Sequence, residues 1–280
     1  KIITILELLI IVNNMNKLLI LGHKGMLGNA CHSYFSSRKD EFEVLTMEER
    51  FPDISFKEKI KEINPDFIIN CIGKIPQKDN LKNTGQEFYK TNIELPEFLE
   101  TLDIKIIHPS TDCEFSGDLP REKLYNKNSK RDAMDPYGKS KAFISEKIEN
   151  EFKNTKIIRV SIIGHEINTS LSLLDWALSQ ENSTRGYIDH YWNGITTLEW
   201  SIICHKIIKN WDETPTLSQY GTEEINSKYD LLKIIFEVYN KNIKVKEYST
   251  GKDVNKCLES DARLKNIKQQ LKDLKIFYNK

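Results

Sequence analysis

Residues 17–28 read KLLILGHKGMLG, a short apolar run that leads directly into three regularly spaced glycines. The run KLLILG (17–22) has no polar alternation, which is expected of a strand buried on both faces of a parallel sheet. From Leu27 to Phe35, apolar side chains then recur at the spacing of an amphipathic helix. A strand, a glycine turn and a helix in this order predict the first unit of a parallel α/β sheet.

The same alternation continues along the chain. Further strands are expected at 42–46, 66–71, 104–110 and 156–162, and helices at 55–63, 86–101 and 137–153. After about residue 165 the rhythm loosens, with helices near 171–180, 196–210, 226–240 and 267–277 and strand-like pieces at 215–219 and 243–248. We therefore predict a Rossmann-type, doubly wound parallel sheet over 15–164, and a smaller C-terminal α+β substrate lobe over 165–280 that is interleaved with it.

Composition narrows the class of protein. The 280 residues are 39% hydrophobic and carry 41 basic and 41 acidic side chains, which indicates no general attraction to nucleic acid or to an anionic membrane. Five cysteines, none in a CxxC pair, favour reduced thiols in a cytoplasm over a disulfide framework or a metal site. Residues 1–14, KIITILELLIIVNN, are too short and too interrupted by Glu7 to span a bilayer, so we expect an N-terminal extension before Met15.

The glycines indicate a ligand. Gly22, Gly25 and Gly28 lie between the first strand and its helix, where a dinucleotide fingerprint is found. Such glycines let the backbone approach a pyrophosphate, and the helix N-terminus offers free N–H groups to the phosphates. The spacing is GxxGxxG rather than GxGxxG, and the alternative is a glycine turn without a ligand.

The sequence favours NADP(H) over NAD(H). An acid at the end of the second strand would bind the ribose 2′-hydroxyl of NAD, but this strand ends in Thr46 and Met47, and Glu48 comes late. Lys24, inside the glycine loop, is placed to meet a 2′-phosphate, unless it is merely a solvated surface residue.

A tyrosine and a lysine four residues apart occur in DPYGKSKAFISEK (135–147). On a helix this spacing places Tyr137 and Lys141 on one face. The same spacing recurs at Tyr229/Lys233 and Tyr248/Lys252, so spacing alone does not indicate chemistry. Only the first pair lies between two predicted sheet strands, and it follows a strand that ends in Ser110, Thr111 and Asp112. Because strand ends line the ligand crevice of a doubly wound sheet, this pair is the predicted site.

Together these motifs resemble the extended short-chain dehydrogenase/reductases, and more closely the dTDP-4-dehydrorhamnose reductase group of nucleotide-sugar enzymes, which serve polysaccharide biosynthesis. The similar pieces are INCIG (69–73), KTNIELP (90–96), STDCEFSG (110–117), DPYGKSKAFISE (135–146) and NGITTLE (193–199). The resemblance implies catalytic roles for Thr111, Tyr137 and Lys141. It implies a cofactor site made of Gly22, Lys24, Gly25, Met26, Leu27, Gly28, Cys71, Ile72, Gly73, Asn92, Tyr137 and Lys141. The implied substrate contacts are Ser110, Asp112, Cys113 and Glu114.

The chain departs from the family pattern at two positions. Cys113 stands where these reductases usually have tyrosine, and Thr196 replaces a usual proline, which affects the expected sugar more than the expected reaction. In that reaction Lys141 is expected to lower the pKa of the Tyr137 phenol. Tyr137 would protonate a carbonyl oxygen held by Thr111 while hydride arrives from NADPH or NADH.

The first hypothesis is therefore a reductase of a nucleotide-linked 4-keto-6-deoxy sugar, acting without a metal and on no nucleic acid or membrane, with a homodimer as an expected assembly. An epimerase or dehydratase on the same scaffold is the second, because Asp112 and Glu114 could imitate a dehydratase acid pair. The third is a non-catalytic nucleotide-binding regulatory subunit, against which the intact Thr111, Tyr137 and Lys141 set counts.

Overall fold

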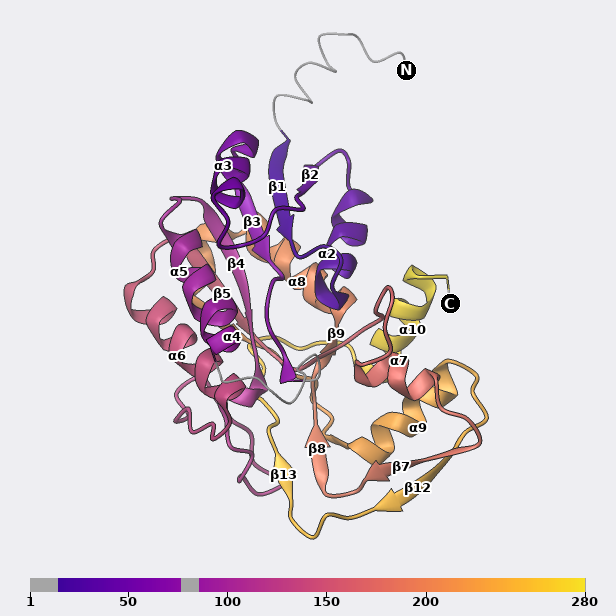
Figure 1. Cartoon of the computed structure of the whole chain (residues 1–280). Helices are drawn as coiled ribbons and strands as arrows, with labels where there is room; N and C mark the ends of the chain where they lie inside the picture. Colours follow the sequence, from indigo (N-terminus) through magenta and orange to yellow (C-terminus); the bar gives the residue numbers. More distant parts are fainter. Residues whose placement is uncertain (1–14, 77–85, 280) are drawn as a thin grey trace.

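The computed structural model describes residues 15–76 and 86–279, and the predicted extension at 1–14 lies outside them. Its centre is a six-stranded sheet in the order β10-β5-β4-β3-β1-β2, with every pair of neighbours parallel (Figure 1). The strands are β1 Asn16–Leu21, β2 Phe42–Thr46, β3 Phe67–Asn70, β4 Lys105–Ser110, β5 Thr155–Arg159 and β10 Leu217–Gln219. The predicted Rossmann-type α/β fold is confirmed.

Helices cover both faces of this sheet (Figure 1). On one face lie α3 Ile54–Ile63, α5 Leu95–Glu100 and α6 Pro136–Glu151; α4 Gln86–Tyr89 and the π-helical turn η2 Lys90–Glu94 lead into α5. On the other face α2 Met26–Ser36 packs against α8 Thr197–Lys209. Burial on both faces explains why β1 and β3 are apolar without alternation.

The second part of the chain supplies elements to both regions. α8 packs against α2, and β10 pairs with β5, so both elements belong to the layers of the six-stranded sheet. The remaining elements form the smaller lobe: β6 Ile162–Ile163, α7 Leu173–Leu178, β7 Ser183–Tyr187, β8 His190–Trp192, β9 Ile195–Thr196, β11 Asn226–Ser227, α9 Lys228–Val238, β12 Lys244–Tyr248, β13 Val254–Asn255 and α10 Ile267–Phe277. Short 3-10 turns are η3 Asp112–Glu114 and η4 Trp211–Glu213. Within the described ranges, no helix is long and apolar enough to cross a membrane.

Candidate active site

The glycine loop is shaped by close backbone contacts. Gly22 has φ +75° and turns the chain sharply after β1, and a Cβ on it would lie 3.0 Å from the backbone of Cys71. A Cβ on Gly28 would come within 2.2 Å of the Gly22 carbonyl oxygen, so α2 packs directly on the loop. Gly25 has far more room, with its nearest contact at 3.4 Å. The outer glycines therefore serve packing, and the middle one leaves an open approach to the helix.

This approach suits a phosphate. Gly25 is the N-cap of α2, and no side chain of the described residues caps that helix end, so the first N–H groups point outward from Met26 and Leu27. The loop after β3, Cys71 to Gly73, lies beside Gly22. These residues fit a dinucleotide, as predicted.

Asn92 holds the wall of this region in place. It is fully buried in η2, accepts a hydrogen bond from the Lys74 N–H at 2.9 Å and donates to the Lys74 carbonyl and to Ser140 Oγ, both at 3.2 Å. The loop after β3 is thereby joined to α6. Asn92 supports the predicted cofactor site by positioning that loop.

The predicted preference for NADP(H) assumed that no acid lies at the end of β2, and the structure shows that one does. Glu48 does reach the glycine loop: its carboxylate lies 2.6 Å from Lys24 Nζ and 3.4 Å from His23 Nε2. Glu48 comes two residues after the end of β2, and the chain at that point turns toward the glycine loop. An acid is therefore present, and Lys24 is paired with it. These two residues alone do not select NADP(H) over NAD(H).

Thr111 and Tyr137 come together at the carboxyl end of β4. Thr111 directly follows the strand, and its hydroxyl accepts a hydrogen bond from the Cys113 N–H at 3.1 Å. Tyr137 lies in the first turn of α6, where Asp135 is the N-cap and accepts from the Gly138 N–H at 2.8 Å. The Thr111 hydroxyl lies close enough to the Tyr137 phenol to lower the pKa of the phenol. Two groups expected to act on one carbonyl oxygen are thus neighbours.

Lys141 lies one turn further along α6 and is buried. Its Nζ donates to the Pro109 carbonyl at 2.9 Å and lies 3.4 Å from His108 Nε2. His108 Nδ1 is in turn 3.2 Å from Asn70 Nδ2 at the end of β3. The ammonium is therefore held by strand β4. Asn70 and His108 are positioning residues that the sequence analysis missed, although both lie in the strands it identified.

The expected lowering of the tyrosine pKa is not what the structure shows. Burial raises the pKa of Tyr137, with Cys113, Asp112 and Asp135 acting in the same direction, and only the Thr111 hydrogen bond opposes them. Burial also lowers the pKa of Lys141 to about 8. The reason is that the phenol is enclosed among acidic and thiol groups while Nζ is directed to the strand. Tyr137 is accordingly a protonated phenol at neutral pH.

Two predicted substrate contacts have a different environment. Glu114 is fully buried and its carboxylate lies 2.7 Å from both Arg159 Nη2 and Arg131 Nε. It also accepts hydrogen bonds from Ser145 at 2.6 Å and from Ser110. Since all of these partners belong to the protein, this geometry favours a structural role for Ser110 and Glu114 rather than contact with substrate.

Asp112 and Cys113 remain at the site. Both are partly buried, and Asp112 Oδ1 accepts from the Thr111 hydroxyl at 3.1 Å. Burial raises the pKa of the Cys113 thiol to about 12, so it is a neutral group and not a nucleophile at neutral pH. Asp112 and Cys113 stay predicted substrate contacts at the start of η3.

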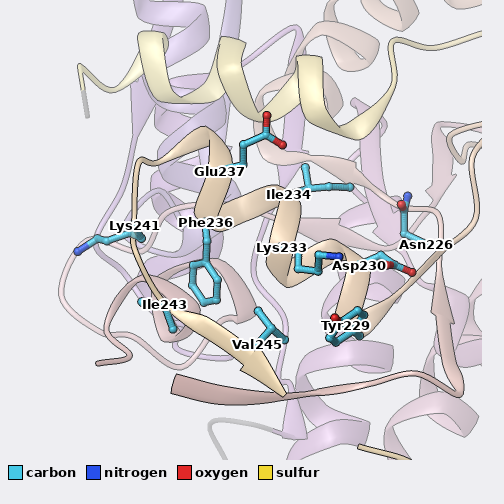
Figure 2. Close-up of a pocket in the computed structure, with 10 residues that line it drawn as sticks. All are labelled: Asn226, Tyr229, Asp230, Lys233, Ile234, Phe236, Glu237, Lys241, Ile243 and Val245. Atoms are coloured by element: carbon cyan, nitrogen blue, oxygen red, sulfur yellow. The ribbon is translucent and has the colours of Figure 1, made fainter. Parts of the chain in front are cut away.

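The two other tyrosine–lysine pairs lack this context. Tyr229 and Lys233 line a surface hollow between α9 and β12, where Lys233 Nζ lies 5.0 Å above the Tyr229 ring (Figure 2). Tyr248 ends strand β12, and Lys252 pairs with Asp118 at 2.8 Å. Neither pair adjoins the glycine loop or the end of β4.

The sheet, the glycine loop and the joined Thr111, Tyr137 and Lys141 define an extended short-chain dehydrogenase/reductase. The family model described as RmlD substrate binding domain matches residues 15–266, and the chain belongs to this family. No curated protein matches the chain.

Solved structures share the fold at low sequence identity. A dTDP-4-dehydrorhamnose reductase from Clostridium acetobutylicum is 18% identical, with a TM-score of 0.78 over 94% of this chain and 100% of its own. The enzyme of the same name from Bacillus anthracis, in complex with NADP, is 17% identical, with a TM-score of 0.79 over 94% and 99%. A GDP-mannoheptose C4 reductase from Campylobacter jejuni with NADP bound is 12% identical, with a TM-score of 0.73 over 95% and 99%.

Proposed function

We propose that the protein is an NAD(P)H-dependent reductase of a nucleotide-linked 4-keto-6-deoxy sugar. The observation that carries the proposal is the meeting of Thr111, Tyr137 and Lys141 at the end of β4, beside an open glycine loop. Solved relatives that are named as nucleotide-sugar reductases, two of them with NADP bound, support both the substrate class and the cofactor.

The residues divide the chemistry between them. The bound nicotinamide cofactor supplies hydride to the carbonyl carbon of the sugar. Tyr137, which is protonated because its pKa is raised, donates its proton to the carbonyl oxygen. The Thr111 hydroxyl turns from Asp112 to hold that oxygen. Lys141, one turn further along the same helix, binds ribose hydroxyls of the cofactor.

The dehydratase alternative loses support from the environment of Glu114. A dehydratase needs an additional acid pair near the sugar, and the Glu114 carboxylate is enclosed by Arg159, Arg131 and two serines. An epimerase remains distinguishable by its behaviour, because it returns its cofactor to the starting oxidation state. A regulatory subunit would bind nucleotide without turnover.

The deciding experiment is cofactor consumption against a panel of nucleotide 4-keto-6-deoxy sugars. We expect stoichiometric loss of NADPH or NADH absorbance with at least one sugar, and formation of the 4-hydroxy product. Product formation without net cofactor consumption would indicate the epimerase. Cofactor binding without turnover of any sugar in the panel would indicate the regulatory subunit.

A further inference from the structure

Lys228, a lysine of the smaller lobe, lies near the segment Thr111 to Cys113, which we call the catalytic segment. Lys228 is the first residue of α9, directly after Ser227, whose side chain caps the helix by accepting from the Asp230 N–H at 3.0 Å. The strand before it, β11, pairs with β8, and this pairing sets Asn226 opposite Trp192. Lys228 Nζ lies 5.4 Å from the centre of the Trp192 ring. Position and direction of the side chain are thus determined by a capped helix and a paired strand.

The ammonium of Lys228 has no anionic partner. It forms neither an ion pair nor a hydrogen bond with any residue in the ranges 15–76 and 86–279. Burial lowers the pKa of Lys228, and among nearby groups Asp112, Cys113 and Cys257 act to raise it. A partly buried cation that lacks a partner is costly in a protein, which makes it a candidate for pairing with a ligand.

The neighbours of Lys228 place it at the active site. Asp112 and Cys113 directly follow Thr111, and the same two residues act electrostatically on Tyr137. The strand before Lys228, β11, pairs with β8, β8 pairs with β13, and Asn255 of β13 forms a bridge with Asp118, so the part of the lobe that carries Lys228 adjoins the segment that follows Thr111. A ligand whose carbonyl is held by Thr111 and Tyr137 extends its other end toward the smaller lobe.

Trp192 completes this side of the site. Its indole N–H donates to Ser161 Oγ at 2.8 Å, and the residue is 3% exposed, so the ring is fixed in orientation. An aromatic face next to an ammonium holds the cation in place through cation–π attraction. The pair is rigid before any ligand binds.

We propose that Lys228 binds the diphosphate of the nucleotide-sugar substrate, an inference that rests on the proposed function. In such a substrate the diphosphate is attached to the anomeric carbon, across the sugar ring from a carbonyl at C4. With the carbonyl at Thr111 and Tyr137, the diphosphate is directed to the smaller lobe, where Lys228 is a partly buried cation without an anionic partner among the described residues. A charge-assisted hydrogen bond from Nζ to a phosphate oxygen satisfies the ammonium.

The same helix offers a matched control. Lys233 is one helical turn and a half further along α9, is exposed, and lines the surface hollow with Tyr229 (Figure 2). It has the same charge and the same helix, but it is not near Thr111, Asp112 or Cys113. Lys233→Met therefore separates the effect of a lysine on α9 from the effect of a lysine at the site.

The test measures dissociation constants of dTDP, UDP, thymidine and NADPH for the parent protein, Lys228→Met, Lys228→Arg and Lys233→Met by calorimetric titration. We expect Lys228→Met to weaken the preferred nucleoside diphosphate by about 10- to 100-fold, which is the usual value of one charge-assisted hydrogen bond. Thymidine and NADPH affinities should stay unchanged, Lys228→Arg should retain most of the affinity, and Lys233→Met should match the parent protein. Melting temperatures of all variants show whether each one is folded, and Lys228→Gln replaces Lys228→Met if the latter does not fold.

The inference is overturned if Lys228→Met binds the diphosphates as the parent protein does, if thymidine binding falls equally, or if the parent protein binds no nucleoside diphosphate. These outcomes are distinct from failure of the proposed function, which is read from cofactor consumption by the parent protein. A parent protein that reduces a nucleotide sugar while Lys228→Met retains its diphosphate affinity would leave the function standing and remove Lys228 from it.

Discussion

Burial raises the pKa of the Tyr137 phenol, nearby acidic and thiol groups act in the same direction, and the Thr111 hydroxyl opposes them. Tyr137→Phe removes one oxygen and should leave folding and cofactor affinity nearly intact. We expect turnover to fall by roughly 10²–10⁴-fold, the usual contribution of general acid catalysis. Steady-state cofactor consumption measures this effect. Tyr229→Phe and Tyr248→Phe share the spacing to a lysine but not the site, and should keep full turnover. Parent-like turnover by Tyr137→Phe would exclude the proton-donor role.

Lys141 predicts a pH dependence of cofactor binding. Burial lowers the pKa of its ammonium to about 8, so the charge that binds the cofactor is present below this pH and is lost above it. The affinity for NADPH should therefore be constant on the acid side and fall as the pH rises through about 8. Fluorescence titrations across this range measure it. Lys141→Arg keeps its charge, so its residual affinity should not fall in the same range; a parallel fall in both proteins would assign the effect to another group.

Glu48 and Lys24 predict a change in cofactor choice. Glu48→Gln removes the carboxylate beside Lys24 Nζ, which would otherwise repel a 2′-phosphate. We expect the ratio of NADPH to NADH affinity to rise by roughly tenfold, the effect of removing one close like charge near water. Lys24→Ala should lower the same ratio. Titration of both cofactors into the three proteins decides the matter, and an unchanged ratio in both variants would place the ribose elsewhere.

At this scale the sequence indicated candidates for the chemistry and missed Asn70 and His108, which hold Lys141 in position. Thr111, Tyr137 and Lys141 were identifiable because each occurs in a recognisable motif at the end of a strand or the start of a helix. Lys228 carries no local signal, since a lysine after a helix cap is common. The proposed role of Lys228 depends on the pairing of β11 with β8, which brings Lys228 near Asp112. The buried ion pair of Glu114 could not be predicted, because its partner Arg159 is distant in the sequence.

Elements were easier to predict than their partners. The helix predicted at 267–277 is α10 Ile267–Phe277, and the strand predicted at 42–46 is β2 Phe42–Thr46, because periodicity and capping residues are local signals. A strand was predicted at 215–219, where β10 lies, but its place beside β5 was not predictable because it depends on a long-range pairing. For α8, the amphipathic pattern predicted a helix but could not show that α2 is its partner.

The β1–loop–α2 unit gives a prediction that separates packing from binding. Gly28→Ala would place a Cβ within 2.2 Å of the Gly22 carbonyl, so the helix must move and the melting temperature should fall markedly. Gly25→Ala meets that oxygen only at 3.4 Å, so it should fold nearly as stably but bind cofactor more weakly, because its methyl group stands in the phosphate approach. Thermal unfolding and NADPH titration of both variants measure this. Equal melting temperatures for the two variants would contradict the assigned division of roles.

At the scale of the whole molecule, one buried polar network joins the catalytic segment to the smaller lobe. Glu114 binds Arg159, which donates to Gln219 Oε1 at 3.0 Å. Gln219 in turn donates to the carbonyls of Tyr125 at 2.8 Å and Glu259 at 3.0 Å. The segment after β4 is thereby connected through the sheet to residues near the C-terminus. The position of Thr111 thus depends on residues near the C-terminal end of the chain.

This network predicts a large effect on stability from a small change. Glu114→Gln leaves the fully buried Arg159 without its carboxylate, and removing one partner of a buried ion pair costs about 3–5 kcal/mol. We expect the free energy of unfolding, measured in urea, to fall by that order. Lys268→Met, which breaks an exposed pair with Glu237, is the control and should leave the unfolding midpoint nearly unchanged. Because the amide offers one oxygen where the carboxylate offers two, either the arginines or Ser110 and Ser145 lose their acceptor, and turnover should fall in the folded Glu114→Gln protein as Thr111 loses its fixed position. A variant as stable as the parent protein would show that the arginine finds another partner and that this network does not hold the lobes together.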